Sequence, residues 1–98
     1  HRVAGVDANP YLVAAVTLGT ALDGIEAATP PGPAGAADDR PLPSSWAEAI
    51  RLFEGSATMA RILGPEFHAG FAAIKRAEYD RLATEVTDVE WSLYGFTV

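Results

Sequence analysis

The chain has 98 residues, 49% of them hydrophobic, with a formal net charge of −6 and a pI near 4.6. This length accommodates one small domain, and the acidic balance without a basic patch disfavours nucleic-acid binding. The chain contains no cysteine, which excludes a disulfide framework and a thiolate metal site and is compatible with the cytoplasmic location that we expect.

The first predicted element is a helix over residues 10–25, entered from an irregular loop. Asn9 is a strong N-cap, and Pro10 suits the first helical position, where its missing N–H would have no helical partner. Between Tyr11 and Leu22 the sequence is uncharged, with apolar residues on every face. This stretch is shorter than the ~20 residues that span a bilayer, so we expect no membrane segment. It is typical of a helix buried on all sides, which needs more cover than the rest of this chain supplies.

The remainder of the chain predicts a loop, four further helices and no strand. The loop over residues 27–43 is rich in Pro, Gly and Ala and has no hydrophobic period. Ser45 is followed three residues later by Glu48, which is the spacing of a capping box, and the same pattern recurs near the C-terminus. We expect helices near residues 45–54, 57–63, 65–85 and 88–93, so the predicted fold class is mainly α.

Two groups of aromatic residues have different predicted roles. Those in the middle of the chain lie at helical spacing and are expected to form the core: Trp46, Phe53, Phe67 and Phe71. The C-terminal group belongs to a segment too short to bury it, so we expect it to dock on the rest of a larger protein or on a neighbouring subunit. That group comprises Trp91, Tyr94 and Phe96.

Arg2 is the candidate catalytic residue. An arginine presents a planar fork to a carboxylate or a phosphate, although for an arbitrary chain a surface arginine is the simpler interpretation. His1 and His68 are the only histidines, and because no acids cluster beside them we expect no metal site there. We expect His68 to be solvated or partly packed. Asp7 is expected to form a turn, with pairing to an arginine as the alternative.

Five segments occur in a fixed order: Asn9-Pro10-Tyr11-Leu12, Leu22-Asp23-Gly24-Ile25, Leu42-Pro43-Ser44-Ser45-Trp46, the run from Lys75 to Arg81, and Val89-Glu90-Trp91 with Leu93-Tyr94. Together they resemble the C-terminal part of the glutamine synthetase family, and the resemblance covers essentially the whole chain. In that family a Glu-x-Arg step precedes the Asn-Pro-Tyr-Leu helix start. Here His1 would be the middle residue and Arg2 the arginine, with the glutamate just before His1.

The resemblance implies that residues 1–98 are the helical C-terminal part of the α+β catalytic domain of a longer protein. It implies an ATP-dependent ligase that joins glutamate to ammonia or an amine through gamma-glutamyl phosphate, with Mg²⁺ or Mn²⁺, in a homo-oligomeric ring. In the family, the arginine matched by Arg2 clamps the reacting carboxylate or the phosphoryl group. Most of this machinery would precede His1, so we expect the chain alone to hold no cofactor and to be inactive.

One departure from the family bears on regulation and on substrate. Members regulated by adenylylation carry a nucleotide-accepting tyrosine in the loop after the first helix, and the loop over residues 27–43 has none. This disfavours that control and is compatible with a paralogue that ligates glutamate to another amine. A free-standing helical interaction module and a catalytically degenerate scaffold paralogue are the alternative hypotheses. The sequence upstream of His1 would separate all three.

Overall fold

Helices account for most of the described chain. The computed structural model describes residues 4–34 and 41–96. Its helices are α1 (Pro10–Glu26), α2 (Trp46–Glu54), α3 (Ala57–Leu63), α4 (Pro65–Ala83) and α5 (Asp88–Tyr94). No strand occurs within those two ranges, and the mainly helical prediction is confirmed. α4 ends before the predicted residue 85 because Thr84 turns the chain: its N–H and its hydroxyl both donate to the Arg81 carbonyl, at 3.3 and 2.8 Å.

Local capping explains where α1 and α2 begin. The Asn9 side chain accepts hydrogen bonds from two N–H groups in the first turn of α1, at 2.9 and 3.3 Å, as predicted. Ser45 accepts from the Glu48 N–H at 3.2 Å, but the Glu48 carboxylate accepts from the N–H of Ser44, at 3.0 Å. In a complete capping box the Glu48 carboxylate would accept from the Ser45 N–H, so this second hydrogen bond is displaced by one residue.

α5 has a complete capping box. The Thr87 hydroxyl accepts from the Glu90 N–H at 3.2 Å, and the Glu90 carboxylate accepts from the Thr87 N–H at 2.9 Å. These two bonds satisfy N–H groups that the helix itself leaves without partners. Hydrogen bonds from the Thr87 backbone and side chain also lower the pKa of Glu90.

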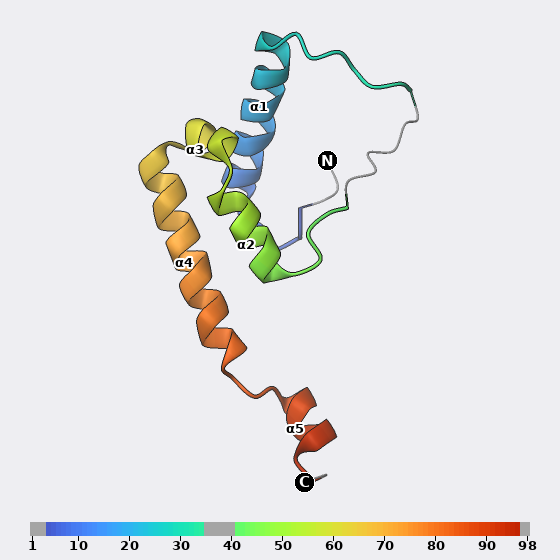
Figure 1. Cartoon of the computed structure of the whole chain (residues 1–98), viewed down its shortest axis with the longest axis vertical. Coiled ribbons are helices and arrows are strands. Elements are labelled where there is room, and N and C mark those ends of the chain that lie inside the picture. The colour runs from blue at the N-terminus through green and yellow to red at the C-terminus, as the bar shows by residue number, and fades with distance from the viewer. Residues whose placement is uncertain (1–3, 35–40, 97–98) are drawn as a thin grey trace.

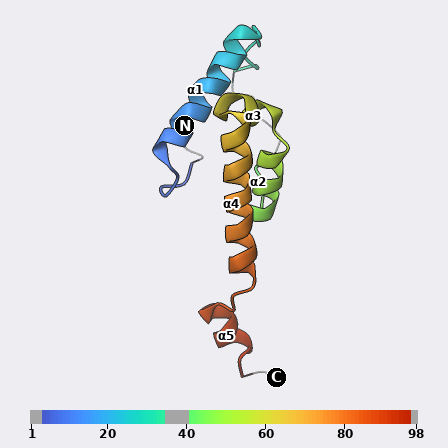
Figure 2. The same cartoon turned by 90° about the vertical axis from the view of Figure 1, so that its left-hand side faces the viewer.

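α2 and α4 run side by side in opposite directions, and the short α3 joins them (Figures 1 and 2). Gly64 makes the sharp connection from α3 to α4 with a φ of +85°, a conformation that favours glycine. α1 packs against α3, and α5 lies beyond the C-terminal end of α4 in both views. The radius of gyration is 17.9 Å, against about 13 Å for a compact domain of this length. The chain is therefore too extended to cover its own apolar surface.

Side-chain exposure corrects part of the predicted core. Among the described residues, the buried ones are Ile50 and Ala72, each 5% exposed, and His68, 8% exposed. Trp46 and Phe67 were predicted to be core, but they are 41% and 45% exposed. No described segment packs over the outer faces of their rings. α1 was expected to be buried all round, yet none of its residues is buried. The burial that its sequence indicates is not supplied by the described residues.

Candidate functional site

The predicted catalytic residue Arg2 lies outside the described residues, as does His1. The loop that follows Arg2 is described from residue 4 to the start of α1. In it, the Ala8 N–H donates to the Gly5 carbonyl at 3.1 Å, directly before the Asn9 cap. The described part of the loop is thus joined to the first turn of α1 by hydrogen bonds as well as by the chain.

Asp7 lies within this turn. A Cβ atom added at Gly5 would be 2.7 Å from the Asp7 Oδ1 atom, so the Asp7 carboxylate folds back over Gly5. This arrangement agrees with the turn-forming role expected of Asp7. The alternative, pairing with an arginine, stays a prediction.

A cleft opens beside the loop, between α1 and the paired helices α2 and α4. Its lining includes Asp7, Trp46, Phe71 and Lys75. The Lys75 ammonium donates to the Glu78 carboxylate at 2.7 Å and lies 5.5 Å from the centre of the Phe71 ring. Both contacts hold the lysine charge at the cleft wall. The cleft therefore presents polar groups from the loop and from α4 around an apolar floor.

An apolar cavity of about 260 Å³ adjoins this cleft. Leu12, Val13 and Val16 of α1 line one side, and Phe67 and Phe71 of α4 line another. The N-terminal half of α1 is consequently separated from α4 by a space that no described side chain fills.

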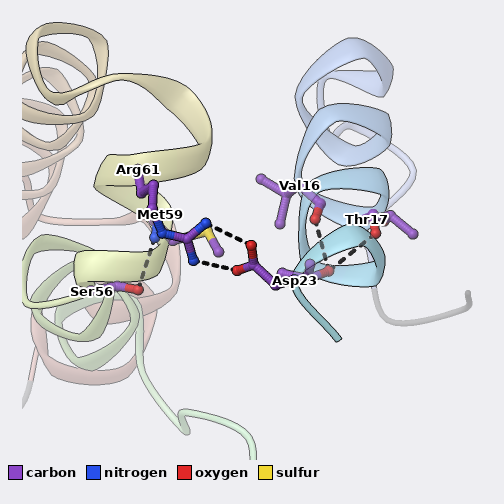
Figure 3. Close-up of polar contacts among 7 residues, drawn as sticks. Val16, Thr17, Asp23, Ser56, Met59 and Arg61 are labelled. Carbon is purple, nitrogen blue, oxygen red and sulfur yellow. Dashed lines mark hydrogen bonds and ion pairs between the residues drawn. The ribbon is translucent and has the colours of Figure 1, made fainter. Parts of the chain in front are cut away.

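The other end of α1 is fastened to α3 by an ion pair (Figure 3). The Arg61 guanidinium donates from Nη1 to Asp23 Oδ1 at 2.6 Å and from Nη2 to Asp23 Oδ2. This two-pronged geometry is the strong form of an arginine–carboxylate contact. The hydrogen bonds from Arg61 lower the pKa of Asp23, and those same bonds raise the pKa of Arg61.

Gly19 lies one helical turn before Asp23 and provides a second attachment to α3. A Cβ atom at Gly19 would be 2.5 Å from Ile62 Cγ2 and 2.9 Å from Ile62 Cγ1. Both atoms are attached directly to the β-carbon of a β-branched side chain, which is stiff. The Ile62 side chain therefore packs directly against the backbone of α1, and only glycine at position 19 leaves room for it.

A second two-pronged ion pair joins α2 to α4. Arg76 donates from Nε to Glu54 Oε1 at 2.9 Å and from Nη2 to Glu54 Oε2. These hydrogen bonds lower the pKa of Glu54 and raise the pKa of Arg76. Beside this pair, His68 Nε2 lies 2.7 Å from the Phe53 carbonyl oxygen. Because a carbonyl only accepts, Nε2 carries the proton. His68 is thus a buried link between α2 and α4, and the expectation of a solvated or partly packed side chain was wrong.

The described residues contain no cluster of side chains that could bind a metal ion. Within residues 4–34 and 41–96, no three His, Asp or Glu side chains are grouped to hold a metal ion. The divalent cations implied by the family resemblance are therefore not assigned to these side chains. Within the same two ranges, no helix is long and apolar enough to cross a bilayer.

The contacts that sequence reasoning missed are the long-range ones. Asp23 and Arg61 are 38 positions apart, and Glu54 and Arg76 are 22 apart. Each residue looks like ordinary surface charge in its own segment, because no local spacing marks its partner. Only the packing of α1 on α3 and of α2 on α4 brings them together.

Comparison with known proteins identifies related sequences. Residues 1–94 match the family model of the glutamine synthetase catalytic domain. The chain is 35% identical over 101 residues to the gamma-glutamylputrescine synthetase of Escherichia coli (strain K12), covering 95% of this chain and 21% of that protein. It is also 35% identical over 95 residues to the gamma-glutamylethanolamide synthetase of Streptomyces coelicolor (strain ATCC BAA-471 / A3(2) / M145), covering 92% of this chain and 21% of that protein. The chain spans about a fifth of the length of these curated relatives. No solved structure matches it significantly.

Proposed function

The chain belongs to the glutamine synthetase catalytic-domain family, and from that premise we propose that it is the C-terminal part of an ATP-dependent ligase that joins the side-chain carboxylate of glutamate to an amine. The observation that carries this proposal is the family match over residues 1–94 together with two relatives named as gamma-glutamyl-amine synthetases. The longer polypeptide of this proposal is called the parent protein below.

An organic amine is favoured over ammonia as the acceptor. Both curated relatives are named for gamma-glutamyl amides of organic amines, gamma-glutamylputrescine and gamma-glutamylethanolamide. The loop over residues 27–43 also lacks the tyrosine through which adenylylated glutamine synthetases are regulated. In the proposed reaction ATP phosphorylates the glutamate side chain, and the amine then displaces phosphate from the acyl phosphate.

Arg2 is the proposed clamp of this reaction. Negative charge is redistributed on the carboxylate and phosphoryl oxygens in the transition state, and a bidentate guanidinium held at that point stabilises it. The described turn before Asn9 supports this role, because it anchors the segment following Arg2 to a helix.

The remaining requirements fall on other parts of the parent protein. As the family resemblance implies, ATP and Mg²⁺ or Mn²⁺ would be bound mostly by segments upstream of His1. We also propose a homo-oligomeric ring in the cytoplasm. The 98-residue chain alone is then catalytically inactive.

The free-standing interaction module is the less favoured hypothesis. The exposed apolar residues of α1, such as Tyr11 at 84% and Leu18 at 70%, fit either a partner protein or the remainder of a catalytic domain. The family match from residue 1 to residue 94 favours the catalytic domain. A degenerate scaffold would share that match and is separated by the sequence upstream of His1 and by activity.

The test is an ATP-hydrolysis assay of the parent protein with glutamate and a panel of amines. We expect ADP release to require glutamate, and to be faster with putrescine or ethanolamine than with ammonia, with the gamma-glutamyl amide identified by mass spectrometry. Absence of amide formation with every amine would support the degenerate scaffold. The 98-residue chain assayed alone is the matched negative control.

A further inference from the structure

α2 and α4 contribute every buried side chain of the described residues. Ile50 of α2 and Ala72 of α4 are each 5% exposed, and His68 of α4 is 8% exposed. α1, α3 and α5 have no buried residue. Because α2 and α3 both pack against α4, this burial comes from contacts of these helices with one another. Segments of a longer protein can add cover to such contacts but are not needed to form them.

His68 connects the first half of α4 to the end of α2. Its Nε2–H donates to the Phe53 carbonyl at 2.7 Å, and its ring lies against the Phe53 ring with centroids 4.5 Å apart. Carbonyls in the interior of a helix are occupied by N–H groups of that helix, whereas those of the last turn have no such partner. Phe53 is in the last turn of α2, so His68 reaches one of the few carbonyls of α2 that can accept from another helix.

This hydrogen bond differs from the apolar contacts around it because it has a direction. Apolar side chains such as Ile50 can separate gradually, since the hydrophobic effect depends on the area in contact and has no direction. A buried N–H that leaves its carbonyl without reaching water costs more than the hydrogen bond itself contributes. A partial separation of α4 from α2 is therefore less favourable than a complete opening, in which water hydrates the His68 ring.

The opposite end of the α2–α4 pair is closed by an aromatic contact. Trp46 at the start of α2 meets Tyr79 of α4 edge-on, with ring centroids 5.8 Å apart, which is a preferred geometry for aromatic pairs. The ion pair between Glu54 and Arg76 adds a charged link between the same helices. α3 belongs with them, because it packs against α4 and Gly64 alone separates the two helices.

We propose that His68 holds α2, α3 and α4 together as one cooperative unit, which opens as a whole and separately from α1. The unit extends over residues 45–84, from the N-cap of α2 to the C-cap of α4, and is called the helical unit below. Its contacts lie between its own helices, so other segments of the parent protein can pack over it without replacing them. The proposal is independent of the reaction that the parent protein catalyses.

The first experiment is hydrogen exchange of the wild-type parent protein, followed by mass spectrometry of its peptides at rising denaturant concentrations below the unfolding transition. Amides that exchange through the same opening converge on one free energy and one denaturant dependence. We expect the protected amides of α2, α3 and α4 to converge in this way and those of α1 to follow a different dependence. Separate openings of α2 and α4, or one opening shared with α1, would overturn the proposal.

The second experiment compares His68→Phe with His68→Gln in the same measurement. Phenylalanine keeps a ring against Phe53 but has no N–H, and the Phe53 carbonyl keeps its hydrogen bond from the Ser56 N–H at 3.0 Å. One hydrogen bond is thus lost, which corresponds to about a two- to tenfold change in an equilibrium constant. We expect exchange to quicken by this factor throughout the helical unit, and His68→Gln, whose amide N–H can donate to the same carbonyl, to restore part of the protection. Quickening confined to α4, quickening that extends to α1, or no change would contradict the role of His68.

Thr87→Val is the matched control outside the helical unit. It keeps the shape of the side chain and removes the hydroxyl that accepts from the Glu90 N–H at 3.2 Å. We expect its effect on exchange to be confined to α5. Quickening of the helical unit by Thr87→Val, to the same extent as by His68→Phe, would show that any lost hydrogen bond loosens the unit and would remove the special role of His68.

Discussion

α1 and α4 are the two longest helices, with 17 and 19 residues, yet they are used in different ways. α4 is rich in charge, packs against α2 and α3, and contributes the buried residues His68 and Ala72. α1 is nearly uncharged, packs against α3, and has no buried residue. The more apolar helix is the less covered one, so hydrophobicity in this chain indicates where a missing neighbour belongs rather than where the described core lies.

The strongest test of this contrast is the behaviour of the 98-residue chain in isolation. We expect it to associate or aggregate, because apolar side chains such as Leu18 and Ile25, 70% and 75% exposed, remain in contact with water. Sedimentation velocity measures this directly. A compact monomer with well-dispersed amide resonances would contradict the prediction and favour the free-standing module.

The second test separates stability from activity in the parent protein. Ile50 is the buried residue of α2, 5% exposed, so Ile50→Ala should cost about 2–5 kcal/mol of stability. Arg2→Lys keeps the positive charge but loses the bidentate geometry of the guanidinium. It should cost ~2.7–4 kcal/mol of transition-state stabilisation, or about 10²–10³ in turnover. The stability of the fold should change little.

Thermal melts and steady-state assays of both variants decide this second prediction. Trp46→Ala is an intermediate control, because the half-exposed ring should cost less than the ~3–5 kcal/mol of a fully buried aromatic residue. Near-normal turnover by Arg2→Lys would return Arg2 to the class of surface arginines.

The third test compares two glycines of α1. At Gly19 a new Cβ atom would overlap Ile62, whereas at Gly24 it would meet no atom within 4 Å. Gly19→Ala should therefore destabilise the protein by about 1–3 kcal/mol through overpacking. Gly24→Ala should be neutral or stabilise it by up to about 1 kcal/mol through helix propensity. Denaturant unfolding of the two variants measures the difference, and equal effects would show that α3 moves to accommodate the methyl group.

The smallest expected effect is the acid sensitivity of the two ion pairs. Because Arg61 and Arg76 lower the pKa values of Asp23 and Glu54 in the folded state, the unfolded state binds more protons in acid. The stabilisation is complete above the usual pKa values of 3.8 and 4.5 and is lost as the pH falls through the lowered ones.

Melting temperatures between pH 6 and pH 3 measure this loss. Asp23→Asn and Glu54→Gln should each flatten the profile, and salt should do the same because the pairs are exposed. A profile unchanged by both variants would mean that other carboxylates govern the acid response.

Capping residues and hydrophobic spacing, which act over a few positions, predicted the helices. They did not predict contacts between residues far apart in the sequence. Asn9, Ser45 and Thr87 act within three residues of themselves, so their capping roles were readable from spacing. The burial of His68 depends on a carbonyl 15 positions away, and the exposure of Trp46 depends on a layer that the described residues do not supply. The Asp23–Arg61 pair, likewise, has no signature in either segment.

The candidate site was predicted only in part, for the same reason. The loop-to-helix junction at Asn9 followed from cap and proline preferences, and the structure shows how it is hydrogen-bonded. The role of Arg2 came from the order of motifs and stays a prediction, since that residue lies outside the described ranges. The separation of α1 from α4 by a cavity was not predictable, because the residues that line it are ordinary core residues by composition.

The chain's two tryptophans lie in different surroundings, one packed against another aromatic ring and one exposed on α5. Their fluorescence can therefore report on the two parts of the molecule separately. Trp46 stands against Tyr79 at a ring-centre distance of 5.8 Å, whereas Trp91 on α5 is 60% exposed. In Trp46→Phe the remaining indole reports on α5 alone. Its emission should move to shorter wavelength, and its quenching by iodide should weaken, when α5 passes from water to a protein surface. Fluorescence of the parent protein and of the 98-residue chain, both carrying this substitution, would therefore show whether the C-terminal helix is covered when the protein is whole.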